Sequence, residues 1–301
     1  MVWVLSPKTT RKARGDKRGK VVMARSEQGL IRPRTTTVDG LTIRFAESGA
    51  GSQDAILLSP WPESIYAFDQ VWARLGQDTH LLAIDPPGFG RSERTRALLS
   101  PRAMGDFIVR VADIFELEQP HLVGPDIGTS STLFAAASRP GRFRSVVVGS
   151  GGAAVPLNLT GVLKDWVEAA DLEPYRRMDG RDIVDIALST IEGYQPPDHI
   201  RDDYRTSYEG DGFAESMRYA RAYPEQLPIL GDLLSGIQTP VRIIQGDHDQ
   251  VVPRANAEYL HERLPHSQVD YLDAGHFCWE EKPAEYAALV ADWWERHRRS
   301  V

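Results

Sequence analysis

The chain has 301 residues, 42% of them apolar and 26% charged, a composition typical of a globular protein with one large domain and an insertion. Its formal net charge is −7. No run reaches the roughly 18 apolar residues of a membrane span, so no membrane partner is expected. The single cysteine, Cys278, excludes an internal disulfide and a cysteine-rich zinc site, and a cytoplasmic location fits it best.

Residues 1–34 form a basic segment. They hold ten of the 35 Lys and Arg residues beside only two acids, Asp16 and Glu27. Because no aromatic residues interleave the charges between residues 8 and 20 and no amphipathic pattern appears, we expect a disordered extension that binds neither nucleic acid nor membrane. The apolar run at residues 2–5 is too short for a secretory signal.

The remaining chain alternates short apolar runs with helical stretches, which predicts an α/β fold with a mostly parallel sheet flanked by helices. It opens with a hairpin whose strands, Thr35–Val38 and Leu41–Phe45, flank Asp39-Gly40, a dipeptide typical of a type I′ turn. The predicted later strands are Ala55–Leu58, Leu81–Ile84, His121–Val123, Ser145–Val148, Val241–Ile244 and Val269–Leu272, and the helices between them include Ala67–Leu75, Arg102–Glu116 and Ser130–Ser138.

Residues 155–237 break this alternation. They show helical patterns at Val162–Ala170, Arg181–Ile191, Asp211–Ala222 and Glu225–Leu234 and no convincing strand. We therefore expect a helical cap at residues 155–237, inserted into a core domain of residues 35–154 and 238–301.

The turn Gly124-Pro125-Asp126-Ile127-Gly128 follows a predicted strand and carries the first candidate catalytic residue, Asp126. An ionised carboxylate can displace a leaving group from saturated carbon, whereas a serine in such a turn attacks carbonyls. The backbone N–H of Ile127 would begin a helix and face a developing oxyanion. The alternative is an aspartate that only caps the helix.

Two further loops follow predicted strands and complete a triad. Asp249 is positioned to orient a histidine, although Asp247 is a rival on spacing alone, and His276 is the natural base. The order nucleophile, acid, histidine is the one that the α/β-hydrolase arrangement requires. A fourth loop, Ser59–Ser64, contains Trp61, whose backbone N–H is a candidate oxyanion donor.

Other side chains near these loops are expected to be structural. Glu63 and Asp273 are acids that could tune the site, but surface acids are commoner. Cys278 is expected to be a small buried residue rather than a reactive one.

At these motifs the chain resembles the α/β-hydrolase superfamily over about residues 35–298, and specifically its aspartate-nucleophile branch of epoxide hydrolases and haloalkane or fluoroacetate dehalogenases. Asp85-Pro86-Pro87-Gly88-Phe89-Gly90-Arg91-Ser92 also carries the likeness. The resemblance implies that Asp126 forms an alkyl-enzyme ester and that water activated by His276, which Asp249 orients, hydrolyses it. It implies no metal and no cofactor.

The chain departs from the family pattern in three places. The usual His-Gly-x-Pro loop stands here as Ser59–Pro62, the residue before the nucleophile is Pro125, and Ile127 replaces the tryptophan that usually follows it in haloalkane dehalogenases. Trp61 or Trp166 would have to replace that halide ligand. Epoxide hydrolases use cap tyrosines as acids, and Tyr219 and Tyr223, four residues apart and so expected on one helical face, are the first candidates. Further candidates are Tyr175, Tyr194, Tyr204 and Tyr208.

We therefore expect an epoxide hydrolase that gives a diol, with a haloalkane-type dehalogenase as the alternative and a non-catalytic hydrolase-like binding protein as a further one. An esterase is less favoured. The apolar and aromatic residues of the expected cap suit a small-molecule substrate that is apolar and either bulky or aromatic, although the same residues would also build the core of a cap. A homodimer is compatible with the sequence.

Overall fold

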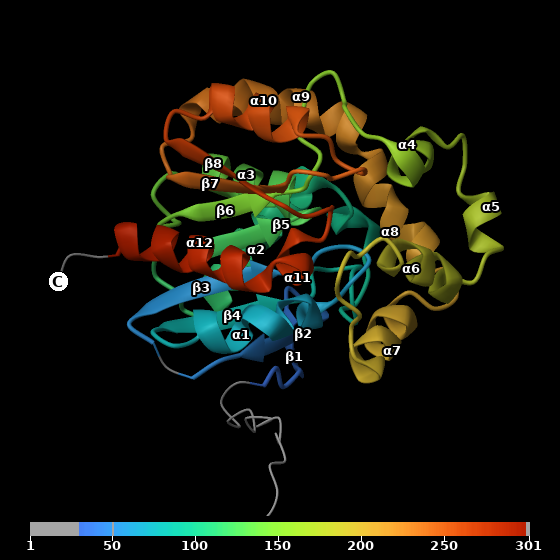
Figure 1. The fold of residues 1–301 in the computed structure, drawn as a ribbon, viewed down its shortest axis with the longest axis horizontal. Coiled ribbons are helices and arrows are strands. Elements are labelled where there is room, and N and C mark those ends of the chain that lie inside the picture. The colour runs from blue at the N-terminus through green and yellow to red at the C-terminus, as the bar shows by residue number, and fades with distance from the viewer. Residues whose placement is uncertain (1–29, 50, 299–301) are drawn as a thin grey trace, which may run out of the picture.

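The computed structural model describes residues 30–49 and 51–298, and within them eight strands form one sheet (Figure 1). The strand order is β1-β2-β4-β3-β5-β6-β7-β8, antiparallel where β2 pairs with β1 and β4 and parallel elsewhere. The strands are β1 (Arg34–Val38), β2 (Leu41–Glu47), β3 (Gln53–Leu58), β4 (Thr79–Ile84), β5 (His121–Pro125), β6 (Val146–Gly149), β7 (Val241–Gly246) and β8 (Ser267–Leu272). The predicted fold class is confirmed. Most of the predicted basic extension, residues 1–29, lies outside the described residues.

The first two strands form the predicted hairpin. Asp39 and Gly40 have φ angles of 51° and 82°, and Val38 pairs with Leu41. These two positive angles are those of a type I′ turn, which explains the Asp-Gly dipeptide.

Helices cover both faces of the sheet. In Figure 1, α1 (Asp69–Leu75) and α12 (Pro283–Arg296) lie in front of it, and α2 (Pro101–Ile114) and α3 (Gly128–Ser138) lie behind it. Because both faces are covered, every residue of β5, β6 and β7 is buried, and these strands are mostly apolar, with His121, Arg242 and Gln245 as buried polar exceptions. The other described α-helices outside residues 155–237 are α10 (Ala255–Arg263) and α11 (Cys278–Glu281). Short 3-10 helices lie at Ile65–Phe68, Arg96–Leu98 and Leu234–Gly236.

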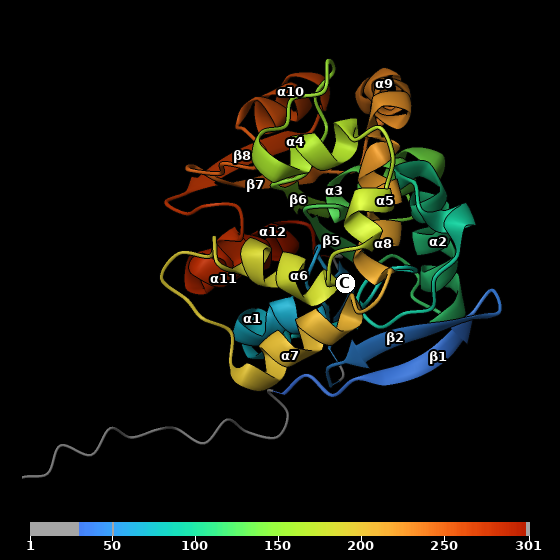
Figure 2. The ribbon, with the colours of Figure 1, turned by 90° about the vertical axis from the view of Figure 1, so that its right-hand side faces the viewer.

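The run between β6 and β7 is helical, and we call residues 155–237 the helical insertion. The helices of the insertion are α4 (Gly161–Glu168), α5 (Glu173–Arg176), α6 (Gly180–Leu188), α7 (Asp198–Ser207), α8 (Gly212–Arg221) and α9 (Tyr223–Leu233). Figure 2 looks onto α4, α6 and α7, which lie in front of the sheet in that view. The four helical patterns predicted from the sequence correspond to α4, α6, α8 and α9.

Helix α7 was not predicted because its sequence is mostly polar. Its buried face includes a charged residue, Asp203, which accepts two hydrogen bonds of 2.8 and 2.9 Å from the guanidinium of Arg44 on β2. Arg44 also lies 3.3 Å from Asp85, which follows β4. This buried ion pair joins the helical insertion to the sheet in place of an apolar contact.

Among the described residues, no helix combines the length and apolarity needed to cross a membrane.

Candidate active site

Asp126 occupies a sharp turn between β5 and α3. Its φ angle is 52°, in the left-handed region that a non-glycine residue enters only at a cost, and such strain is often found at functional sites. Two glycines make the turn possible. A Cβ atom on Gly124 would come within 2.5 Å of the Thr132 side chain, and one on Gly151 within 2.2 Å of the Asp126 carbonyl oxygen.

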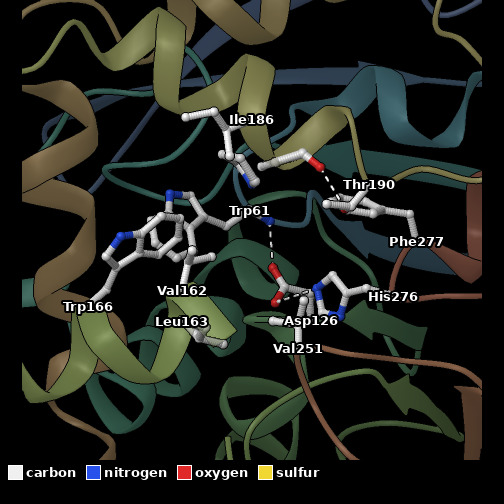
Figure 3. A pocket seen from close by; sticks show the side chains of 12 residues that line it. Trp61, Asp126, Val162, Leu163, Trp166, Ile186, Thr190, Val251, His276 and Phe277 are labelled. Carbon is white, nitrogen blue, oxygen red and sulfur yellow. Dashed lines mark hydrogen bonds and ion pairs between the residues drawn. The ribbon is translucent and has the colours of Figure 1, made fainter. Parts of the chain in front are cut away.

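The Asp126 carboxylate lies between the Trp61 loop and His276. One oxygen, Oδ2, accepts a hydrogen bond of 2.7 Å from the Trp61 backbone N–H, and the other, Oδ1, lies 3.7 Å from Nε2 of His276 (Figure 3). Although its sequence is altered, the Ser59–Pro62 loop places a backbone donor at this carboxylate. The side chain is buried, with only 4% of the residue exposed.

The structure distinguishes the two candidate acids. Asp249 Oδ2 lies 2.9 Å from Nδ1 of His276, whereas the exposed Asp247 pairs with Arg254. The other oxygen of Asp249 accepts hydrogen bonds of 2.8 Å from the backbone N–H groups of Val251 and Val252. The loop after β7 therefore fixes Asp249 against the histidine.

Burial and ion pairing act in opposite directions on the charges of this triad. Burial disfavours the His276 cation, but the attraction of Asp249 and Asp126 outweighs it and raises the pKa of His276 to about 10. Burial likewise disfavours the Asp249 anion, yet the contact with His276 lowers the pKa of Asp249 overall. Near neutral pH the histidine is therefore an imidazolium between two carboxylates.

A cavity of about 130 Å³ opens above Asp126. Its polar side chains are Asp126, His276 and Thr190, and in Figure 3 Trp166 lies at the far side of it from His276. The cavity is lined by Trp61, Pro62, Asp126, Val162, Leu163, Trp166, Ile186, Ala187, Thr190, Val251, His276 and Phe277.

The two candidate tyrosines lie outside this lining. The expectation of one shared helical face is wrong, because Tyr219 lies on α8 and Tyr223 begins α9, although their ring centroids are 5.9 Å apart. The hydroxyl of Tyr219 donates a hydrogen bond of 2.8 Å to the Ile127 carbonyl oxygen. Tyr223 is likewise almost fully buried, and burial raises the pKa of both phenols. Both side chains lie near Ser130 of α3, so this structure does not direct either hydroxyl at a leaving group.

The aromatic candidates differ in what their indoles contact. The indole N–H of Trp61 donates a hydrogen bond of 2.9 Å to Ser216, so this group already has a partner within the protein. Trp166 packs edge-on against Trp61, with ring centroids 5.3 Å apart. Ile127 is buried and occupies the N-cap position of α3, where the helix was expected to begin, and its side chain makes no cap hydrogen bond.

Sequence reasoning did not identify every residue of this region. The cavity wall residues Ile186 and Thr190 lie on or near α6, and nothing in their local sequence marks them. Glu63, expected at the surface, has no exposed area and neighbours the site, whereas Asp273 is exposed as expected. The position of Glu63, two residues after Trp61, was the available signal.

The described residues contain no cluster of three or more His, Cys, Asp or Glu side chains arranged to hold a metal ion.

The model of the alpha/beta hydrolase fold family matches residues 56–283. The chain belongs to this family. It is 24% identical over 268 residues to the uncharacterized hydrolase YugF of Bacillus subtilis, covering 86% of this chain and 96% of the relative. It is also 24% identical over 273 residues to a 2-hydroxy-6-oxononadienedioate/2-hydroxy-6-oxononatrienedioate hydrolase of Pseudomonas putida, covering 84% and 91%.

Solved structures share the fold at lower identity. An epoxide hydrolase, CorEH, superposes with a TM-score of 0.75 at 16% identity, over 89% of this chain and all of the other. An esterase from Exiguobacterium antarcticum gives 0.72 at 19%, over 86% and 97%. Since enzymes with different substrates share this architecture, the likeness to these structures establishes the fold alone, and the reaction must be argued from the site.

Proposed function

We propose that the protein hydrolyses a small apolar epoxide to a diol through an ester of Asp126. The observation that carries the proposal is the Asp126 carboxylate in the turn between β5 and α3. It accepts a hydrogen bond of 2.7 Å from the backbone N–H of Trp61 and lies 3.7 Å from His276 at the base of an apolar cavity. A carboxylate in this place can attack saturated carbon without first losing a proton.

In the first step, an oxygen of Asp126 forms a bond to an epoxide carbon and the C–O bond of the ring breaks. The oxygen that leaves needs a proton, because an alkoxide is a poor leaving group. Since neither Tyr219 nor Tyr223 lines the cavity, we assign this proton to the His276 imidazolium, the charged acid among the described lining residues. The products are a hydroxyalkyl ester and a neutral histidine.

In the second step, the same histidine is a base. Esterification removes the negative charge of Asp126 that had favoured the imidazolium, so neutral His276 is able to take a proton from water. The hydroxide attacks the ester carbonyl carbon, and in this proposal the backbone N–H groups of Trp61 and Ile127 stabilise the oxyanion that forms. When this intermediate collapses, its C–O bond to the substrate breaks and the leaving oxygen takes the second proton of the water. The diol is released, and the ion pair of the Asp126 carboxylate and the His276 imidazolium is restored.

The lining also limits the substrate. Among the described lining residues, Thr190 carries a hydroxyl in addition to the charged groups of Asp126 and His276. This hydroxyl donates a hydrogen bond of 2.7 Å to the Ala187 carbonyl oxygen. Apart from Asp126 and His276, which already pair with each other, the described lining residues offer a charged substrate no opposite charge to offset its lost hydration. We therefore propose a neutral, largely apolar epoxide.

Dehalogenation is the second candidate because Trp166 lines the cavity and has an indole N–H. It is less favoured because the Trp61 indole, the other expected halide ligand, donates to Ser216. The non-catalytic alternative rested on the altered Ser59–Pro62 loop. The 2.7 Å contact from Trp61 supports the catalytic proposal instead.

The test is intact-mass analysis of His276→Gln after incubation with panels of epoxides and haloalkanes, with Asp126→Asn as the matched control. Solvent can supply the alkoxide proton slowly, whereas ester hydrolysis lacks its base, so an adduct should accumulate. A gain equal to the whole epoxide supports the proposal, and a gain equal to the alkyl group without halogen supports dehalogenation. No adduct together with no turnover by the unaltered protein would contradict both.

A further inference from the structure

Two buried carboxyl groups lie behind the triad, outside the cavity. Glu63 is fully buried in the Trp61 loop, and Glu280 on α11 is 2% exposed. Their side chains lie within hydrogen-bonding reach of each other. A buried carboxylate is costly unless it is paired, so this contact requires an explanation.

Each carboxyl has one oxygen with a partner and one without. Glu63 Oε2 accepts from the Trp279 indole N–H at 3.0 Å, and Glu280 Oε1 accepts from the Tyr204 hydroxyl at 3.1 Å. Among the described residues, no donor serves Glu63 Oε1 or Glu280 Oε2. One proton held between the carboxyls would satisfy both of these oxygens.

The contacts of the pair connect three parts of the site. Glu63 lies two residues from Trp61, whose N–H contacts Asp126. Trp279 packs edge-on against His276, with ring centroids 6.0 Å apart. From the insertion, helix α7 contributes Tyr204, which contacts Glu280.

Helix α7 and the residue that follows it also hold the Trp61 loop directly. The hydroxyl of Tyr208, directly after α7, donates a hydrogen bond of 3.1 Å to the Glu63 carbonyl oxygen, and the Ser64 hydroxyl donates one of 2.7 Å to Asp203 on α7. The loop is therefore fixed from the insertion on one side and from α11 on the other.

We propose that Glu63 and Glu280 share one proton and are positioning residues that hold the Trp61 loop, α11 and α7 together around the triad. The catalytic consequence rests on the proposed function, whereas the shared proton does not.

The electrostatic surroundings favour the protonated pair. Burial, followed by the neighbouring Glu280, raises the pKa of Glu63 well above its usual range, and burial raises the pKa of Glu280 to about 7. The titratable groups that face the pair are Asp126, Asp69, Glu281, Tyr204 and Tyr208, together with His276 across Trp279.

A raised folded-state pKa gives a defined sign. Below about pH 4.5 both carboxyls are protonated in the folded and the unfolded chain. As pH rises from about 4.5 to 7, the unfolded chain releases both protons while the folded chain keeps them, and above about pH 7 Glu280 gives up its proton and the pair shares the one that remains. Stability from the pair is therefore fully present below about pH 4.5 and falls as pH rises, with the part due to Glu280 lost by about pH 7. Because unfolding releases up to two protons, the unfolding constant should rise by about tenfold to a hundredfold per pH unit in this window.

The first experiment needs no substrate. Infrared difference spectroscopy should show the carbonyl stretch of a buried carboxylic acid near pH 6 and should still show it just above pH 7, where one proton remains. Glu63→Gln/Glu280→Gln should lose that band and the associated slope of stability against pH. Glu285→Gln, a change of an exposed acid on α12, is the matched control and should keep both. Should the double variant not fold, the presence or absence of this band above pH 7 in the unaltered protein still decides the matter.

Catalysis gives a separate readout. Glu63→Ala should lower kcat by about tenfold or more with little change in KM, and Glu63→Gln, which keeps a donor and an acceptor, should recover most of it. Loss of kcat in both variants with unchanged stability, or no protonated carboxyl in the unaltered protein, would overturn the proposal. Because the infrared and stability measurements use no substrate, failure on epoxides alone would contradict only the proposed function.

Discussion

Asp249→Asn is the substitution that most sharply tests the triad. Asn keeps an oxygen for the N–H groups of Val251 and Val252, so the loop after β7 should keep its fold, while the bond of 3.1 Å that Oδ2 accepts from Gln245 Nε2 is lost. Its amide N–H₂ would then face Nδ1 of His276, where the present contact is 2.9 Å. Two donors cannot share that contact, so Nδ1 must become an acceptor and Nε2 must carry the proton.

That tautomer cannot take a proton from water through Nε2. In serine proteases the corresponding Asp-to-Asn change costs about 10⁴ in kcat because it gives the wrong tautomer, and at 1.36 kcal/mol per tenfold this is about 5.4 kcal/mol. We expect a similar loss in the hydrolysis of the Asp126 ester, with the imidazolium also destabilised because one of its two carboxylates is gone.

The assay is steady-state turnover of a reactive epoxide, combined with NMR titration of His276 and with Asp247→Asn as the matched control. Asp247→Asn should change kcat less than about threefold, because Asp247 contacts the exposed Arg254 rather than the histidine. Retention of kcat within tenfold by Asp249→Asn, or a large loss in Asp247→Asn, would refute the reasoning.

Three further predictions follow from the same contacts. The pKa of His276 rises from 6.5 to about 10 on folding, so its contribution to stability is fully present below pH 6.5 and is lost as pH rises through 10. Urea unfolding across this range should show the fall in stability, and equal stability at both ends would contradict the ion pair. Arg44→Met should lower the free energy of unfolding by about 3 kcal/mol in chemical denaturation, because it leaves Asp85 buried without its cation and leaves Asp203 with only the half-exposed Arg91, and a change under about 1 kcal/mol would argue against the buried pair. Tyr219→Phe should cost about 1 kcal/mol of stability by removing the bond to the Ile127 carbonyl oxygen yet leave the rate of Asp126 esterification within about threefold; a drop of more than a hundredfold in stopped-flow measurements would instead place Tyr219 at the leaving group.

The elements that local pattern specifies were predictable. Continuous apolar runs gave the buried parallel strands, and Asp39-Gly40 gave the hairpin, because strand burial and turn geometry depend on nearby residues. The placement of Asp126, Asp249 and His276 together followed because the carboxyl ends of parallel strands meet at one edge of the sheet.

Features that depend on distant contacts were not predictable. Helix α7 is held by Asp203 on Arg44 of β2, 159 positions away in sequence, and its polar composition hides this. The direction in which Tyr219 points depends on how α8 packs on α3, which the spacing of two tyrosines does not determine. Glu63 reads as an ordinary surface acid until the fold places it against Glu280 and Trp279.

The central claim is that Asp126 is covalently esterified, and a turnover in ¹⁸O-labelled water tests it most directly. After turnover of an epoxide by excess unaltered protein, the peptide containing Asp126 should carry ¹⁸O, because water attacks the ester carbonyl and leaves its oxygen in the carboxylate, while the diol of the first turnover takes unlabelled oxygen from the protein. Label in the diol and none in the Asp126 peptide would show direct attack by water on the substrate and would contradict the account.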